Sequence, residues 1–388
     1  MAIRIASSPR RRALGLSLVE ILVGVAIGLI GIVAIFQAVA VWSKHTSTTS
    51  AGGDAQVAGT LALFNIERDL KQAGHGFAKA ATAVLGCDVA FADSATARVL
   101  TFGLRPVEIA ASAAGAPDTI TILYGDSSFY GAEGTFTDAT ATTKKLRRRA
   151  GFKKGDVAVV AVNAGASAGT ANCQLVEINQ DGDIDGYTVG HTTDPYVSFY
   201  GGASGPAVTP RFNGASAPVS TSGTMYNLGP QPRLDLWSIQ GNRVLTRTDL
   251  IHGTTPMQIA DGVINMKAEY GVDSGLVPDG VISPGEWTAS APADWRRLLA
   301  IRVAVLVRSR QYERNGDPAA SGVRAVTPTA AKPYYFGDTS KRFAMTNLNS
   351  NADTFDDLTA DPNNWRFYRY RVYERVIPLR NMLWGTTE

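Results

Sequence analysis

One apolar run near the N-terminus constrains this chain more than any other feature. Residues 16–42 (LSLVEILVGVAIGLIGIVAIFQAVAVW) contain only three strongly polar side chains, Ser17, Glu20 and Gln37. As an α-helix rising about 1.5 Å per residue, the run is roughly 40 Å long, which is enough to cross a lipid bilayer. Three arginines at 10–12 precede it. We therefore expect the N-terminus to stay in the cytoplasm and the residues after the run to be exported.

The segment before the run differs from an ordinary secretory signal. In such a signal a small-residue cleavage site follows a short apolar core, whereas here the small residue, Gly15, precedes the run. Cleavage after Gly15 would remove the basic leader and leave the whole apolar helix on the mature protein, with Leu16 at its N-terminus. A twin-arginine export signal, suggested by Arg10 and Arg11, fits a run this long and apolar less well.

Glu20 lies inside the predicted helix and needs a physical explanation. An ionised carboxylate in a membrane-spanning helix is costly unless it finds a partner. If Leu16 becomes a free N-terminus, its charged amine on a neighbouring subunit would neutralise Glu20 as helices bundle. Alternatively, Glu20 reaches the cytoplasmic surface, because it lies only one turn into the helix. The residues alone leave both interpretations open.

The two cysteines, Cys87 and Cys173, both follow the apolar run. If the run delivers them to an oxidising compartment, they are expected to form one disulfide. Closing so long a loop stabilises the fold by roughly 4–5 kcal/mol in the chain-entropy model. A metal site is less favoured, because two lone cysteines without CxxC spacing supply too few ligands.

An amphipathic helix is expected to continue from the apolar run over residues 43–76. Gly52 and Gly53 fall between its two halves, and Gly74 and Gly76 are expected to end it. Its apolar residues recur near the helical period and are expected to pack on a β-sheet; they are Val57, Leu61, Leu63, Phe64, Ile66, Leu70 and Ala73. The charged residues are expected on the opposite face; they are Glu67, Arg68, Asp69 and Lys71.

Beyond the helix, residues 77–388 have the alternating pattern of antiparallel strands with one solvated face. Residues 201–224, rich in Gly, Ser and Pro, are either a surface loop or a boundary between two β lobes. The predicted class is therefore α+β. The expected strands are Arg98–Gly103, Thr119–Tyr124, Val157–Val162, Gln174–Ile178, Leu234–Ile239, Asn242–Arg247, Val263–Tyr270, Leu298–Arg308 and Trp365–Ile377.

Two acidic segments are candidates for calcium. Asp181, Asp183 and Asp185, followed by a glycine, open like an EF-hand loop, but the twelfth position is Thr192 and not the required glutamate. A relaxed calcium loop completed by Asp194 and a solvated acidic turn both remain possible. A second segment runs from Asp273 through Asp279 to Glu286, with broken aspartate spacing.

Charge gives no general argument for nucleic-acid binding. The chain has 37 basic and 34 acidic residues; without the four arginines of residues 1–15, 33 basic residues face 34 acidic ones. The densest basic cluster is interpreted as a solvated hairpin edge whose lysines discourage strand pairing, and direct contact with nucleic acid is not expected, because only Phe152 could stack on bases. The cluster comprises Lys144, Lys145, Arg147, Arg148, Arg149, Lys153 and Lys154.

No pattern predicts an enzyme. Gly165–Gly169 matches G-x-S-x-G, but a strand-like segment follows it and not the helix that a nucleophile elbow requires. The four histidines show no HExxH spacing, and there is no phosphate-binding Walker loop. We expect neither catalysis nor a required cofactor.

The segment GLSLVEILVGVAIG (15–28) resembles the signature of type IV prepilins: a basic leader ending in Gly, an apolar first residue, and Glu at the fifth mature position. The resemblance implies that residues 1–15 are a leader, that a prepilin peptidase cuts between Gly15 and Leu16, and that the new Leu16 amine is methylated. It also implies that Glu20 guides docking into a filament. The implied fold is pilin-like, with a long N-terminal helix packed on an antiparallel β-rich domain. Major pilins commonly begin with Phe, and Leu16 is common among minor pilins.

Later segments are similar to PilW-type minor pilins in the same order. They are FNIERDLKQAGHGF (64–77), GFKKGDVAVV (151–160), MKAEYGVDSG (266–275), WRRLLAIRVAVLVRSR (295–310) and YRYRVYERVIPLRN (368–381). This resemblance implies a subunit that primes pilus assembly with other minor pilins, the major pilin and a tip adhesin, in support of twitching motility, adhesion or DNA uptake. It implies a single-pass inner-membrane protein with a periplasmic domain, which becomes part of the extracellular filament after assembly. The alternative is a minor pseudopilin of a type II secretion system.

Overall fold

A computed structural model describes residues 17–112, 116–128, 133–148, 151–162, 169, 172–181, 187–214, 222–241, 243–310, 332–345 and 365–385. The described residues begin, after Ser17, with one long helix, α1 (Leu18–Leu70), which contains no proline and is unbroken at Gly52 and Gly53. Its first turn is capped by Ser17, whose hydroxyl accepts a hydrogen bond from the backbone N–H of Glu20. The chain divides after Gly53 into two compact units, and Asp54–Glu388 form the second.

Helix α1 ends at Leu70, earlier than the two glycines that were expected to end it. Residues 71–79 form turns instead. The N–H of Gly74 donates to the carbonyl of Leu123, 2.9 Å away, in strand β4 (Thr119–Tyr124). A Cβ on Gly76 would lie 2.7 Å from the carbonyl oxygen of Asn227. The two glycines therefore allow the turn to lie against the sheet after the helix has ended.

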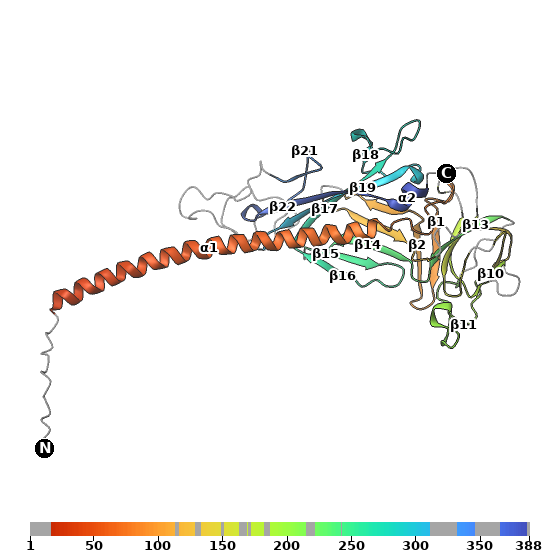
Figure 1. Cartoon of the computed structure of the whole chain (residues 1–388), viewed down its shortest axis with the longest axis horizontal. Helices are drawn as coiled ribbons and strands as arrows, with labels where there is room; N and C mark the ends of the chain where they lie inside the picture. Colours follow the sequence, from red (N-terminus) through yellow and green to blue (C-terminus); the bar gives the residue numbers. More distant parts are fainter. Residues whose placement is uncertain are drawn as a thin grey trace, which may run out of the picture. The chain divides into compact units, whose positions relative to one another are not determined.

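Most strands pair in antiparallel sheets, as expected for the predicted α+β class (Figure 1). A nine-stranded sheet has the order β2-β1-β8-β7-β13-β5-β6-β10-β9, in which only β1 and β8 pair in parallel. Its strands are β1 (Asp88–Asp93), β2 (Arg98–Gly103), β5 (Glu133–Ala139), β6 (Thr143–Leu146), β7 (Val157–Val162), β8 (Asn172–Glu177), β9 (Gln180–Asp181), β10 (Thr188–Gly190) and β13 (Gly223–Gly229).

Two further sheets provide the platform for α1. The five-stranded sheet has the order β16-β15-β14-β4-β3, and the four-stranded sheet has the order β18-β17-β19-β22. Their remaining strands are β3 (Val107–Ala110), β14 (Arg233–Ile239), β15 (Val244–Asp249), β16 (Met257–Asp261), β17 (Val263–Val272), β18 (Trp287–Thr288), β19 (Leu298–Arg308) and β22 (Tyr370–Pro378). Two small hairpins, β11 (Tyr196–Val197) with β12 (Ala207–Val208) and β20 (Tyr334–Tyr335) with β21 (Asp338–Arg342), and a short helix, α2 (Arg380–Gly385), complete the fold.

Four predicted strands, β2, β4, β7 and β19, agree with the structure at both ends. The last predicted strand starts later than expected, because Trp365–Phe367 form a 3-10 turn before β22. In the segment 201–224, residues 207 and 208 form β12 and residue 223 begins β13, while 215–221 lie outside the described residues.

The position of strand β19 explains why its sequence is almost uniformly apolar. It lies between β17 and β22, so both of its edges are paired. Val303 and Val305 face the main core, which also contains the buried residues of α1. Ala304 and Leu306 face a separate cluster on the other side, formed with Phe343, Met345 and Trp365. A strand buried on both faces cannot alternate polar and apolar residues.

The face of α1 that meets the sheets is only partly the predicted one: of the residues expected to pack on a sheet, Leu63, Ile66, Leu70 and Ala73 are buried. Val57, Leu61 and Phe64, expected in the buried stripe, are 68%, 43% and 61% exposed. The buried hydrophobic residues of this part of the helix are Ala55, Ala62, Leu63, Ile66 and Leu70. The helix therefore approaches the sheets through small residues as well as large ones, and apolar residues occur on both of its faces.

Candidate functional site

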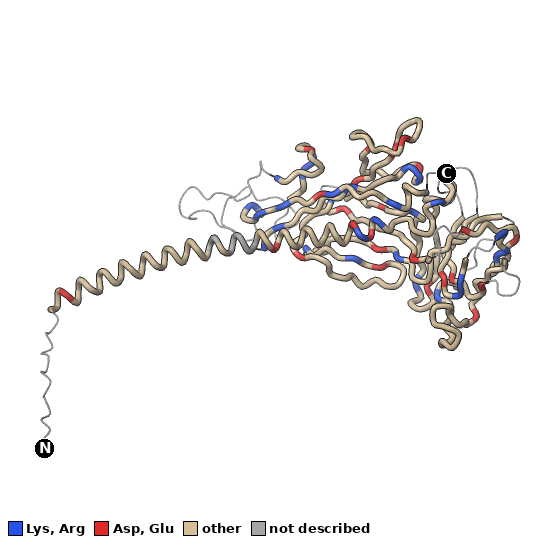
Figure 2. The backbone as a smooth tube through the Cα atoms, viewed as in Figure 1, with Lys and Arg blue, Asp and Glu red and all other residues tan. Residues whose placement is uncertain are grey.

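The first candidate feature is the apolar part of α1. Leu18–Ser43 is long and apolar enough to cross a membrane, with a mean hydropathy of 2.8 in its best window. None of its side chains is buried within the protein. Glu20, in the first turn, is the one charged residue of this span (Figure 2). Gly15 and Leu16 lie outside the described residues, so the structure does not describe the surroundings of the expected cleavage point.

The second feature is the exposed stripe formed by Val57, Leu61 and Phe64. The spacing of four and three residues puts the three side chains on one face of the helix. They face away from the sheets and are solvated in the single chain. Three large apolar side chains aligned on one helix face are typical of an interaction surface, whereas a single exposed one is ordinary.

A charged contact holds the end of α1 on the four-stranded sheet. Glu67 pairs with Arg375 of β22 and with Lys71, whose Nζ is 2.6 Å from it. Its hydrogen bond from Lys71, against some cost of burial, holds the pKa of the Glu67 carboxyl below its usual value. The helix is thereby fixed to the edge strand of the four-stranded sheet, with its exposed stripe turned outward.

Asp69 was expected on the charged, solvated face and is instead buried. It lies 3.5 Å from Arg247 of β15 and 3.1 Å from Arg68, and Arg247 also reaches Asp235 of β14 at 3.9 Å. Burial, together with the nearby charge of Asp235, raises the pKa of the Asp69 carboxyl. The side chain is buried because the sheet supplies a cation at this point, which the helix sequence alone does not reveal.

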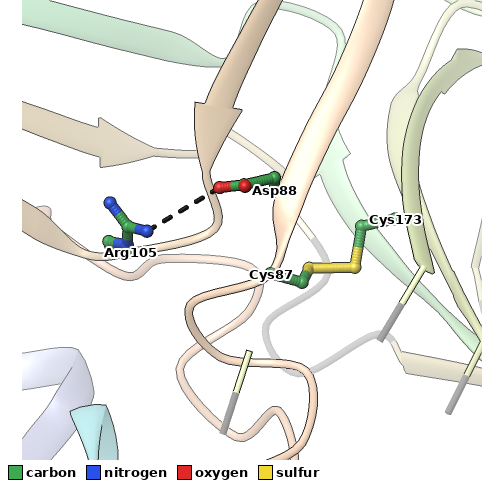
Figure 3. The surroundings of a disulfide bond; sticks show 4 residues. All are labelled: Cys87, Asp88, Arg105 and Cys173. Atoms are coloured by element: carbon green, nitrogen blue, oxygen red, sulfur yellow. Dashed lines mark ion pairs between the residues drawn. A yellow bond between two sulfur atoms is a disulfide. The ribbon is translucent and has the colours of Figure 1, made fainter. Parts of the chain in front are cut away.

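The disulfide candidates are joined: Cys87 and Cys173 form a disulfide with their Cα atoms 6.2 Å apart (Figure 3). Cys87 immediately precedes β1, and Cys173 lies in β8, the parallel neighbour of β1. Both residues belong to the main core. The bond ties the segment that follows α1 to the nine-stranded sheet.

The first acidic segment is only partly described. Asp181 ends β9, and its carboxylate lies 3.7 Å from Nζ of Lys154. Asp183 and Asp185 lie outside the described residues. Within the part of the chain that the structure describes, no group of three or more His, Cys, Asp or Glu side chains could hold a metal ion.

The second acidic segment uses its carboxylates internally. Asp273, Asp279 and Glu286 each accept hydrogen bonds from backbone N–H groups of the same loop. Carboxylates placed in this way order the loop.

The interpretation of the basic cluster as a solvated hairpin edge was wrong for Lys144 and for strand β6, whereas Lys145, Arg147 and Arg148 are exposed. Strand β6 lies between β5 and β10, and the side chain of Lys144 is fully buried there. Its Nζ donates to the carbonyl of Thr140 at 2.6 Å and lies 3.3 Å from Nε2 of His191. Burial lowers the pKa of Lys144 to about 8, and burial with the nearby Lys144 lowers the pKa of His191 to about 4. Lys144 is therefore unavailable to a phosphate.

Of the G-x-S-x-G segment only Gly169 is described; residues 165–168 lie outside the described residues. Sequence reasoning missed the exposed stripe, because it assigned the same three residues to the core.

Residues 238–381 match the family model of PilW, described as type IV pilus-assembly protein W. This segment runs from the end of β14 to α2 and includes the edge strand that contacts α1. The resemblance to the PilW family is thus confirmed over these residues, and it indicates a role connected with the type IV pilus. No match was found among curated proteins or among solved structures.

Proposed function

We propose that this chain is a minor pilin that primes type IV pilus assembly and enters the filament at or near its tip. In this proposal it is held in the inner membrane by the apolar part of α1, with its β-rich domain in the periplasm, before it joins the extracellular filament. Its partners are other minor pilins, the major pilin and a tip adhesin. We assign it no catalytic step.

The observation that carries this proposal is that α1 exposes apolar side chains both within and beyond its membrane span. A membrane anchor needs only to be apolar where it meets lipid, yet α1 also exposes Val57, Leu61 and Phe64 after the apolar span ends at Ser43. Burying one such side chain fully is worth roughly 1.5–3 kcal/mol. A helix that is apolar both within and beyond its membrane span is suited to packing against helices of other subunits. The match of residues 238–381 to PilW supports the same role.

Glu20 completes the docking hypothesis. It is the single charge in an otherwise apolar span, and a charge at that place is costly without a partner. In the proposed filament its partner is the methylated amine of Leu16 on a neighbouring subunit. Processing by a prepilin peptidase between Gly15 and Leu16 is therefore a requirement of the proposal.

Mass spectrometry of the mature N-terminus in the native cell tests this requirement. The expected result is a protein that begins with N-methylated Leu16 and is present in sheared pili. A protein that retains Met1 and is missing from sheared pili, in cells whose pilus number does not change on its deletion, would refute the proposal.

Docking through the exposed stripe is tested by substituting two of its residues. Leu61→Ser with Phe64→Ser should leave the protein folded and membrane-inserted, because both side chains are exposed, while reducing its amount in sheared pili several-fold. The matched control is Gln56→Ser with Thr60→Ser, which changes exposed polar residues of the same helical segment. Equal incorporation of the two double variants would contradict docking through the stripe.

Glu20→Ala separates membrane insertion from docking. The variant should insert normally, because it removes a charge from the span, but it should enter pili poorly. The alternative function, a minor pseudopilin of a type II secretion system, predicts a different phenotype: deletion would block secretion of exported proteins and leave pilus number unchanged.

A further inference from the structure

The connection between β17 and β18 exposes a second group of apolar side chains, far from α1 in the sequence. Within six residues, Leu276 is fully exposed, Val277 is 80% exposed and Val281 is 60% exposed. We call these three side chains the apolar tip. Figure 1 shows the connection projecting beyond the four-stranded sheet, beside the β18 label.

The loop that carries the apolar tip is held by the side chain of its first residue and by one from outside the loop. Asp273, almost fully buried, accepts a hydrogen bond from the N–H of Gly280 at 2.8 Å. Arg297, in the 3-10 turn just before β19, donates to the carbonyl of Gly275 at 2.6 Å. These two contacts fasten both sides of the tip to the ordered sheet.

Two further carboxylates shape the loop from within. Glu286 accepts from the N–H and the hydroxyl of Ser274, at 2.8 and 2.9 Å, and from the N–H of Ser283 at 2.7 Å. These bonds hold the pKa of Glu286 below its usual value, so it stays ionised. Asp279 accepts from the N–H of Val281 at 2.8 Å. Ordering a loop before binding reduces the entropy that binding must overcome.

Other apolar residues near the loop pack on the sheet, unlike the three side chains of the apolar tip. A Cβ on Gly271 of β17 would lie 2.6 Å from Ile282 and 2.8 Å from Trp287. Ile282 and Trp287 thus pack closely on the sheet and form the base of the loop. The three tip side chains contribute nothing comparable to the fold and remain in water, at a cost that a binding partner would remove.

A lipid surface and a protein cleft could each cover such a tip, and the charges around the tip decide between them. From residue 273 to residue 297, four side chains are acidic (Asp273, Asp279, Glu286 and Asp294) and two are basic (Arg296 and Arg297), and Arg297 already donates to the backbone carbonyls of Asp273 and Gly275. Loops and helices that insert into lipid surfaces carry basic residues, because biological membranes are negatively charged. An apolar tip in an acidic setting is therefore poorly suited to lipid and well suited to a protein cleft with basic residues around it.

We propose that the apolar tip inserts into an apolar cleft with a basic rim on a second protein of the cell envelope. This interaction is separate from the helix docking proposed above and does not depend on it. Leu276, Val277 and Val281 supply the buried contact, and Asp279, at the tip itself, faces the basic rim.

Site-specific photocrosslinking of the full-length protein in its native cell tests this inference. A benzophenone amino acid replaces Leu276 in one strain and Val281 in a second. In a control strain it replaces Val99, which is 79% exposed in β2, an edge strand of the nine-stranded sheet. The expected result is one protein adduct shared by positions 276 and 281 and not formed from position 99. Mass spectrometry should place the crosslink in a peptide with Lys or Arg beside apolar residues.

Asp279→Asn provides the matched variant. Its amide oxygen can still accept the hydrogen bond from Val281, so the loop should keep its shape and the protein its melting temperature, but the charge is lost. The yield of the adduct from position 276 should fall at least threefold. An unchanged yield would contradict the proposal that basic residues of the partner surround the cleft.

Four other outcomes would overturn the inference: no adduct, a lipid adduct, an adduct with a second copy of this chain, or the same adduct from Val99. If one of them occurs while the protein in pili still begins with methylated Leu16, the inference fails and the proposed function stands. If the expected adduct forms on a protein that is neither processed nor found in pili, the proposed function fails and the inference stands.

Discussion

Gly59 of α1 lies directly against the ring of Tyr373 in β22, so closely that a Cβ on Gly59 would be 2.3 Å from two carbons of the ring. No real Cβ tolerates such a distance, and the aromatic side chain lies between helix and strand. The glycine therefore allows α1 to cross the edge strand, with Glu67 pairing with Arg375 two turns further along the helix.

Gly59→Ala tests this close approach. Alanine is the better helix former by about 1 kcal/mol, but overpacking against Tyr373 should outweigh that gain and destabilise the protein by about 1–3 kcal/mol in net terms. The measurement is denaturant unfolding of the full-length protein in detergent. Gly53→Ala is the control: nothing lies within 4 Å of its Cβ position, so it should stabilise slightly. Equal effects of the two substitutions would contradict the packing argument.

Loss of the disulfide should destabilise the β-rich domain. Replacing both Cys87 and Cys173 by Ser removes a crosslink between the residue before β1 and strand β8, at an expected cost of about 2–5 kcal/mol. Thermal melting with and without reductant measures the effect. Reductant should lower the melting temperature of the native protein toward that of the variant and leave the variant unchanged. A shift of the variant by reductant would point to another cause.

Acid sensitivity should depend on Asp93. Arg211 donates to both carboxylate oxygens of buried Asp93 at 2.7 Å, and this pairing, opposed by burial, holds the pKa of Asp93 far below its usual value. A carboxyl with a lowered folded-state pKa stabilises the fold above its unfolded-state pKa, near 4, and this contribution is lost as the pH falls further.

The corresponding variant is Asp93→Asn. It should lower stability at pH 7 by roughly 3 kcal/mol, because Arg211 loses its charged partner. Its melting temperature should then fall less steeply than that of the native protein between pH 5 and pH 3, because one titrating carboxyl is removed. Parallel pH profiles for the two proteins would show that Asp93 does not carry this dependence.

Lys144→Met should stabilise the protein at neutral pH. Burial lowers the pKa of Lys144 to about 8, so below that pH the fold holds a charged amine at a cost that methionine removes. The gain should be about 1–3 kcal/mol at pH 7. It should shrink as the pH rises toward about 10, where the amine of the unfolded chain also becomes neutral. Lys145→Met, at the exposed neighbouring position, is the control and should change stability little at either pH.

Much of the local structure follows from local sequence pattern. The apolar run, the class of the fold and both ends of β2, β4, β7 and β19 could be predicted, because alternation and helical spacing are properties of short segments. The position of Glu20 as the single charge in the span is likewise evident from the sequence alone.

Only the tertiary structure decided which face of α1 is buried and which strands are edges. Helical periodicity defines faces but not the neighbour each one meets, and here Gly59 and Ala62 let one side of the helix come close to the sheets, leaving Leu61 and Phe64 exposed. Lys144 is buried because β10, more than forty residues later, pairs with its strand. Such outcomes depend on contacts between segments that are far apart in the sequence. No local pattern in either segment reveals which segment the other will meet.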